Sequence, residues 1–130
     1  MAERYLIDTS AVIKYLNGSL TDTGLKLMDG IVDEESTLSF VSQIELQVWK
    51  PQNPDDMEVY QEFVANSIVL GIDDEIIAET IRIRKSFNLK LPDAIIAATC
   101  LIHKLVLIAD NDKDFQKVDF LRTLNPNKLK

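Results

Sequence analysis

The sequence predicts an α/β fold with three layers, in which helices cover both faces of a central, mostly parallel sheet. Two observations predict this fold class. Short apolar stretches alternate with helical patterns along the chain, and each apolar stretch is continuous rather than alternating. At 130 residues, with 46% hydrophobic and 27% charged side chains, the chain is expected to form one domain over residues 1–130.

The strands and helices follow from local patterns. Strands are expected wherever a short apolar run occurs, at residues 5–7, 38–41, 67–72, 105–109 and, as a short edge strand, 121–126. Helices are expected between them, at residues 11–16, 25–32, 42–50, 54–67, 73–87 and 92–104. The helix over 92–104 is apolar on nearly every face, with Pro92 at its first position, so we expect it to be buried.

Composition limits the class of protein. No apolar run approaches the ~20 residues of a membrane span, and no N-terminal signal pattern is present, so no membrane association is expected. Cys100 is the one cysteine, which excludes an internal disulfide and favours a cytoplasmic location. The net charge of −7 argues against a generic surface for binding polyanions.

Four acidic residues lie where strands end or helices begin, and each has a local interpretation. Asp8 can cap the helix that follows it, and Asp93 can offset a helix dipole. Glu45 stands three residues after Ser42, which is the spacing of a capping box. Asp112 can belong to a solvated turn.

Taken together, the four acids favour a functional site. In a parallel sheet the ends of strands and the starts of helices share one edge, where ligands bind. Two carboxylates ~4 Å apart repel by roughly 4 kcal/mol at an effective dielectric of 20, so a cluster raises pKa values or attracts a cation. Oxygen ligands without histidine or cysteine favour Mg²⁺, with Mn²⁺ as a substitute.

Four segments resemble the successive motifs of the PIN domain family, and most closely its VapC-type toxins. They are "YLIDTSAVI", "VSQIEL", "LPDAIIAATCL" and "ADNDKDF", and the resemblance runs from Tyr5 to Pro126. It implies that Asp8, Glu45 and Asp93 are three of the family's acids and that the hydroxyl of Thr9 or Ser10 supports them. Asp112 is the first choice for the fourth acid, with Asp114 and Asp110 as alternatives, because the threonine usual in this motif is missing.

The resemblance implies a Mg²⁺-dependent endoribonuclease toxin that a cognate antitoxin neutralises, and it implies a homodimer. Metal held by Asp8, Asp93 and Asp112 would activate water for attack on the RNA backbone. Glu45 is expected either to share in holding the metal or to orient the water, and Asp114 is a possible additional ligand. A catalytically inactive PIN domain that only binds a partner is the main alternative. A receiver-type signalling domain would require a lysine directly after a late strand, and acids stand there instead.

Basic residues near the acids are candidates for contacting RNA. Lys90 precedes Asp93 by three residues and Lys113 follows Asp112, so these two lysines are the proposed substrate contacts. The three bases that end the preceding helical pattern are instead expected to compensate the helix dipole. They are Arg82, Arg84 and Lys85.

Three aromatic side chains allow two interpretations. Trp49, Tyr60 and Phe63 could form an exposed apolar surface for a partner, but aromatics at helical spacing are more often part of a core. The core interpretation is favoured here. Antitoxin binding and dimerisation therefore rest on the family resemblance alone.

Overall fold

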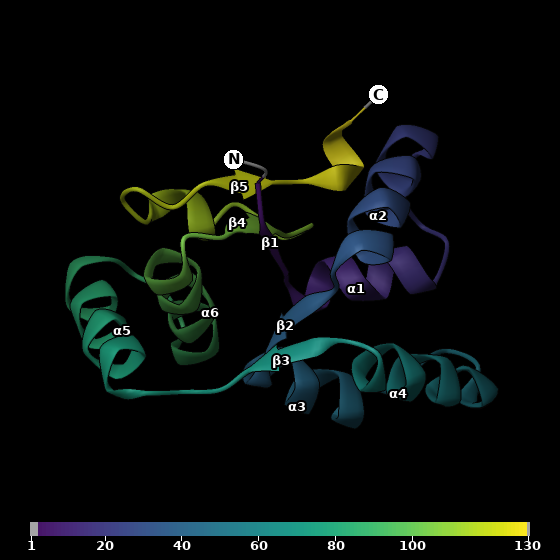
Figure 1. Ribbon diagram of the computed structural model, residues 1–130, viewed down its shortest axis with the longest axis horizontal. Coiled ribbons are helices and arrows are strands. Elements are labelled where there is room, and N and C mark those ends of the chain that lie inside the picture. The colour runs from purple at the N-terminus through teal and green to yellow at the C-terminus, as the bar shows by residue number, and fades with distance from the viewer. Residues whose placement is uncertain (1–2, 130) are drawn as a thin grey trace.

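The computed structural model describes residues 3–129 and confirms the α/β fold class. One group of three strands has β4 at its centre, and a second group pairs two strands. The strands are β1 (Tyr5–Ile7), β2 (Thr37–Ser39), β3 (Ile68–Leu70), β4 (Val106–Ile108) and β5 (Thr123–Leu124). Every pairing is parallel, and β2 packs beside β1, so the five strands follow one another through the middle of the molecule (Figure 1).

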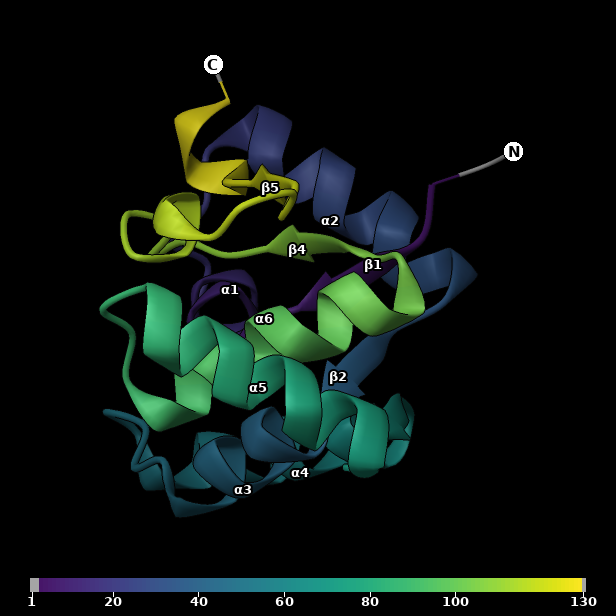
Figure 2. The same ribbon diagram turned by 90° about the vertical axis from the view of Figure 1, so that its left-hand side faces the viewer.

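Helices cover both faces of this layer, which confirms the expected three-layer arrangement (Figures 1 and 2). The helices are α1 (Thr9–Leu16), α2 (Asp22–Glu34), α3 (Phe40–Val48), α4 (Met57–Ala65), α5 (Asp74–Ser86) and α6 (Leu91–His103). Successive strand residues point to opposite faces. Leu6 and Leu107 therefore pack with α5 and α6, whereas Ile7 and Ile108 pack with α1, α2, α3 and α4.

Helix α6 is the buried helix that the sequence predicts. Most of its side chains from Ala94 to Cys100 are buried between α5 and the sheet. Its N-terminus thereby comes to lie at a fixed place on the sheet edge. Within residues 3–129, no helix is both long enough and apolar enough to cross a membrane.

Helix α3 begins at Phe40, two residues earlier than expected. Ser39 forms the cap, because its side-chain oxygen accepts a hydrogen bond from the Val41 backbone N–H at 3.1 Å. Strand β2 therefore ends at Ser39. The expected start at Ser42 is wrong, and Ser42 lies inside the helix.

Two further expectations are corrected. A sheet covered on both faces implies that the strand expected at 67–72 is buried, but Ile68 in β3 is 48% exposed, because β3 pairs only with β2 and forms an edge of the sheet. Helix α6 begins at Leu91, so Pro92 occupies the second helical position, where its missing N–H again costs no hydrogen bond.

The aromatic residues divide between core and surface. Tyr60 is buried, and Phe63 packs edge-on against Tyr15 with ring centroids 6.3 Å apart, which confirms the core interpretation for both. Trp49 differs, because it lies just beyond α3 and is 39% exposed.

The last described segment packs on the start of α2. The Thr21 hydroxyl donates to the Leu129 carbonyl at 2.8 Å. A Cβ atom on Gly24 would lie 2.2 Å from the Pro126 carbonyl oxygen, so only glycine allows this approach. The turn at Pro126–Lys128 is thus held firmly against the body of the protein.

Candidate active site

A cleft of about 460 Å³ opens where β1 and β4 end and where α1, α3 and α6 lie nearby. Its polar residues come from four separate stretches of the chain, and its apolar wall comes from α1 and the end of α3. The polar lining residues are Asp8, Thr9, Ser10, Glu45, Lys50, Asp93 and Asn111. The structure therefore brings together three of the four acids singled out from the sequence.

Asp8 is the most buried of these acids, at 6% exposed. It follows β1 and caps α1, where the Ser10 hydroxyl and backbone N–H donate to the same carboxylate oxygen at 2.7 and 3.3 Å. Burial, aided by the negative charges of Asp93 and Glu45, raises the pKa of Asp8 to about 6 despite these hydrogen bonds, which lower it. Below about pH 6 a proton neutralises this buried carboxylate, and above it the uncompensated charge favours a nearby cation.

Glu45 is held by Thr9 rather than by a helix cap. The Thr9 hydroxyl donates to Glu45 Oε1 at 2.6 Å and lies 2.9 Å from the Ser42 hydroxyl oxygen. Since Ser39 caps α3, the capping-box interpretation of Ser42 and Glu45 is wrong. Both residues instead face α1 from inside α3, which turns the Glu45 carboxylate into the cleft.

Asp93 lies in the first turn of α6 and is half-buried. Burial raises its pKa, and the nearby charges of Glu45 and Asp114 add to the effect, while Lys90 opposes it. Asp8, Glu45 and Asp93 are thus close enough for their charges to interact. Asp114 belongs to the same electrostatic neighbourhood and pairs with Lys117 at 3.0 Å.

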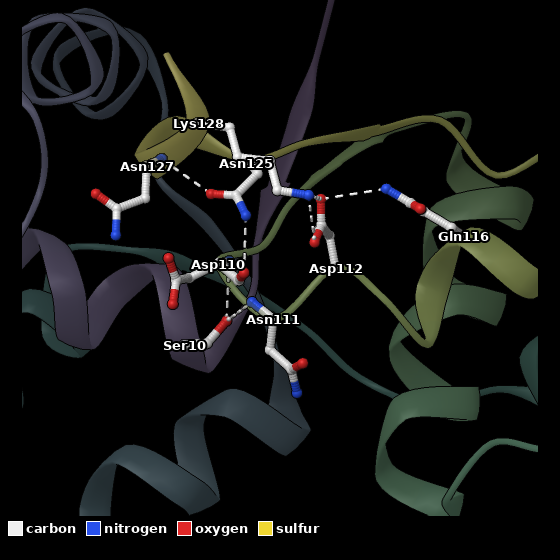
Figure 3. A network of polar contacts seen from close by, with 8 residues as sticks. All are labelled: Ser10, Asp110, Asn111, Asp112, Gln116, Asn125, Asn127 and Lys128. Atoms are coloured by element: carbon white, nitrogen blue, oxygen red, sulfur yellow. Dashed lines mark hydrogen bonds and ion pairs between the residues drawn. The ribbon is translucent and has the colours of Figure 1, made fainter. Parts of the chain in front are cut away.

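Asp112 does not line the cleft. It is buried, and its carboxylate accepts from Lys128 Nζ at 3.2 and 3.3 Å and from the Gln116 side-chain amide at 3.3 Å. Figure 3 shows this carboxylate pointing toward Lys128, whereas the neighbouring Asn111 side chain points the other way. The structure therefore brings Asn111, and not Asp112, to the cleft.

The loop that carries Asn111 is held from two sides (Figure 3). The Ser10 hydroxyl oxygen accepts hydrogen bonds from the backbone N–H groups of Asp110 and Asn111 at 3.1 and 3.3 Å. From the other side, the Asn125 amide donates to the Asp110 carbonyl at 2.8 Å. Ser10 therefore connects Asp8 directly to the loop after β4.

The donor chemistry of the cleft fits a hard divalent cation. Its candidate ligands are carboxylate and amide oxygens, and Asp8 is a buried carboxylate whose charge needs compensation. As the side chains lie, no three acidic, histidine or cysteine residues within 3–129 form a ready-made metal cage.

The two lysines proposed to contact substrate lie in different settings. Lys90 is exposed and lines a second cleft beside Asp93. Lys113 is exposed but lines neither of these two clefts.

The sequence did not single out several residues that complete the site. Asn111 lies two residues after the expected strand at 105–109, and that position was a usable signal for a residue at the sheet edge. Lys50 and Trp49 lie beyond α3 and carried no comparable signal for the cleft. Asn125 and Lys128 act through contacts with residues more than a dozen positions earlier, which no local pattern reveals.

The fold and the cleft together define the class of protein. It is an α/β protein in which carboxylates cluster where the C-terminal ends of the parallel strands lie. The chain belongs to the PIN domain family, since the family model described as PIN domain matches residues 5–121. This agrees with the resemblance carried by the sequence motifs.

Curated and solved proteins resemble the chain over different extents. "Ribonuclease VapC6" and "Ribonuclease VapC2" of Methanocaldococcus jannaschii are 38% and 32% identical over 56 and 69 residues, which cover 43% and 53% of this chain. The matches span less than half of the length of these relatives, 37% and 46%. The crystal structure of DNA-bound VapBC from Salmonella typhimurium has a TM-score of 0.79 at 19% identity, covering 96% of this chain and 99% of that one. At this identity the similarity concerns the fold.

Proposed function

We propose that the chain is a Mg²⁺-dependent endoribonuclease of the VapC type, with Mn²⁺ as a substitute. One observation carries the proposal: three carboxylates from separate elements meet in one cleft, and their mutual repulsion contributes to the raised pKa values of Asp8 and Asp93. RNA as the substrate is supported by the two curated relatives, which are named ribonucleases.

Asp8 and Asp93 would hold the metal, with Glu45 as a neighbouring carboxylate and Asn111 as an amide ligand or a substrate contact. A bound Mg²⁺ would supply an activated water and neutralise charge that develops on the phosphate. Thr9 fixes one oxygen of Glu45, which leaves the other oxygen free to orient water or to approach the cation. Ser10 keeps Asp8 and the loop at Asp110 in a fixed relation.

The fourth acid is best assigned to Asp114 in this proposal. Asp114 interacts electrostatically with Asp93 and its partly exposed carboxylate pairs only with Lys117, whereas the buried Asp112 carboxylate is bound by both Lys128 and Gln116. Asp112 then acts by positioning the loop. We expect Asp114→Asn to weaken Mg²⁺ binding measured by titration calorimetry, and Asp112→Asn to leave metal affinity nearly unchanged. The reverse order would restore Asp112 as the ligand.

The central test is cleavage of single-stranded RNA with mapped ends. We expect cleavage in Mg²⁺ or Mn²⁺, none in EDTA, and a loss of at least about a hundredfold for Asp93→Asn, the range of a lost catalytic group. Asp74→Asn is the matched control, because Asp74 also lies in the first turn of a helix but is exposed and outside the cleft. Cleavage that persists in chelator, or that Asp93→Asn leaves intact, would refute the mechanism.

The partners are also proposals. The chain resembles solved toxin–antitoxin complexes in fold, which supports an antitoxin partner, and coexpression with a candidate antitoxin should restore growth that the wild type arrests. A homodimer and a cytoplasmic location stay predictions. Metal binding without any RNA cleavage would favour the alternative of an inactive binding module.

A further inference from the structure

A second cleft, of about 450 Å³, lies directly beside the acid cluster. It is formed where α5 ends, where α6 begins, and by the segment after Asp114. Lys90 borders it three residues before Asp93, and Asp114 forms part of its wall. Both residues act electrostatically on Asp93, which shows that this cleft and the acid cluster are close neighbours.

The charge of this second cleft is positive. Three cations line it, Arg84, Lys90 and Lys117, against one carboxylate, that of Asp114. Lys117 already pairs with Asp114 at 3.0 Å. Within residues 3–129, no carboxylate lies within ion-pair distance of Arg84 or Lys90, and both side chains are exposed. Two cations without an ion-pair partner among the described residues thus line one cleft, in a chain whose net charge is −7.

The three bases at the end of α5 were all expected to compensate the helix dipole, but they lie in different surroundings. Arg82 pairs with Glu79 and Asp119, so its charge is satisfied within the protein. Lys85 is exposed but lines neither of the two clefts. Arg84 alone of these three bases at the end of α5 reaches the second cleft, where Lys90 meets it from the start of α6.

We propose that Arg84 and Lys90 form a subsite for a backbone phosphate of the substrate RNA, a short distance along the strand from the cleaved bond. The proposal rests on the proposed ribonuclease function. A strand that enters a cluster of carboxylates needs cationic contacts nearby, and neutralisation of phosphates supplies most of the sequence-independent binding energy. Repulsion between Asp114 and the strand is reduced, because Lys117 pairs with Asp114 and a bound metal ion would offset its charge in the same way.

The first experiment compares cleavage kinetics of Arg84→Ala, Lys90→Ala and the double variant with those of Lys85→Ala. Lys85 is a matched control, because it neighbours Arg84 in sequence and has the same charge and exposure. We expect the double variant to raise KM about tenfold with kcat within about twofold. We also expect the slope of log(kcat/KM) against log[salt] to become shallower by about 0.7 in the double variant, because one phosphate is no longer neutralised. Arg84→Lys should retain most of the wild-type behaviour, since the charge remains.

The second experiment locates the phosphate. Substrates carry a single uncharged methylphosphonate linkage at successive positions around the cleaved bond. At one position of the uncharged linkage, we expect kcat/KM of the wild type to fall about as much as kcat/KM of the double variant falls on unmodified RNA. The double variant acting on that modified substrate should show no further loss of kcat/KM. If the losses of kcat/KM from the modified linkage and from the double variant add at every position, the subsite proposal is refuted.

The outcomes separate this proposal from the one on which it rests. If the wild type cleaves RNA and the double variant behaves like Lys85→Ala, the subsite proposal is refuted and the ribonuclease proposal stands. This outcome would also follow if the cleft received an acidic segment of a protein partner instead. A wild type that cleaves no RNA in Mg²⁺ or Mn²⁺ would overturn the ribonuclease, and the subsite with it.

Discussion

The raised pKa of Asp8 makes a quantitative prediction about stability. The pKa rises from 3.8 to about 6 mainly through burial, so the folded protein binds the Asp8 proton more tightly than the unfolded chain does. The folded state is therefore penalised as the pH rises from about 4 through about 6, and the full penalty applies above that range. The difference between these two pKa values corresponds to a penalty of about 3 kcal/mol at pH 8.

Asp8→Asn removes this penalty, because asparagine does not ionise. Asparagine also caps helices about as well as aspartate, although the hydrogen bond from Ser10 loses its charge assistance, at a cost of about 1 kcal/mol. In EDTA at pH 8 we therefore expect the variant to be more stable than the wild type by about 2 kcal/mol. Most of that advantage should disappear at about pH 4.5, where Asp8 in the wild type is protonated.

Urea unfolding followed by circular dichroism, at both pH values and in EDTA, measures the difference. Addition of Mg²⁺ at pH 8 should stabilise the wild type and have less effect on Asp8→Asn, because the cation replaces the missing proton. A variant whose stability relative to the wild type is the same at both pH values would refute the reasoning. The penalty assigned to the buried carboxylate would then be absent.

Two further predictions concern the support of the site. In α2, Gly24→Ala should lower the free energy of unfolding by about 1–3 kcal/mol, because its Cβ would meet the Pro126 carbonyl. Gly30→Ala in the same helix has open space and should raise it by up to about 1 kcal/mol; equal effects in thermal or urea unfolding would contradict the packing described. Thr9→Val should lower kcat for RNA about tenfold with little change in KM, since the hydrogen bond that fixes Glu45 is lost. Thr9→Ser should retain the activity, and an equal loss in both variants would assign Thr9 a role in packing instead.

Much of the fold could be predicted from the sequence, because the signals are local. The continuous apolar run at Val106–Ile108 and the buried helix that begins near Pro92 were both expected. Asp8 and Asp93 could be placed at the sheet edge because strand ends and helix starts share that edge. Their positions depend on the order of the elements and not on individual contacts.

Errors arose where a distant contact decides the outcome. Ser42 and Glu45 fit a capping box by spacing, but Ser39 takes the cap and Thr9, from another helix, binds Glu45. The contact between the Asp112 side chain and Lys128, sixteen residues further on, could not be foreseen either, and the role of Asp112 as fourth acid stays a prediction. Spacing along the chain contains no record of such partners.

The turn at Pro126–Lys128 makes the geometry of the cleft depend on packing that lies outside it. Asn125 and Lys128 hold the loop that brings Asn111 to the cleft, and the turn itself rests on α2 from the first third of the chain. A substitution that loosens the contact between α2 and the turn would therefore also release the loop at Asn111, although neither Gly24 nor Pro126 lines the cleft.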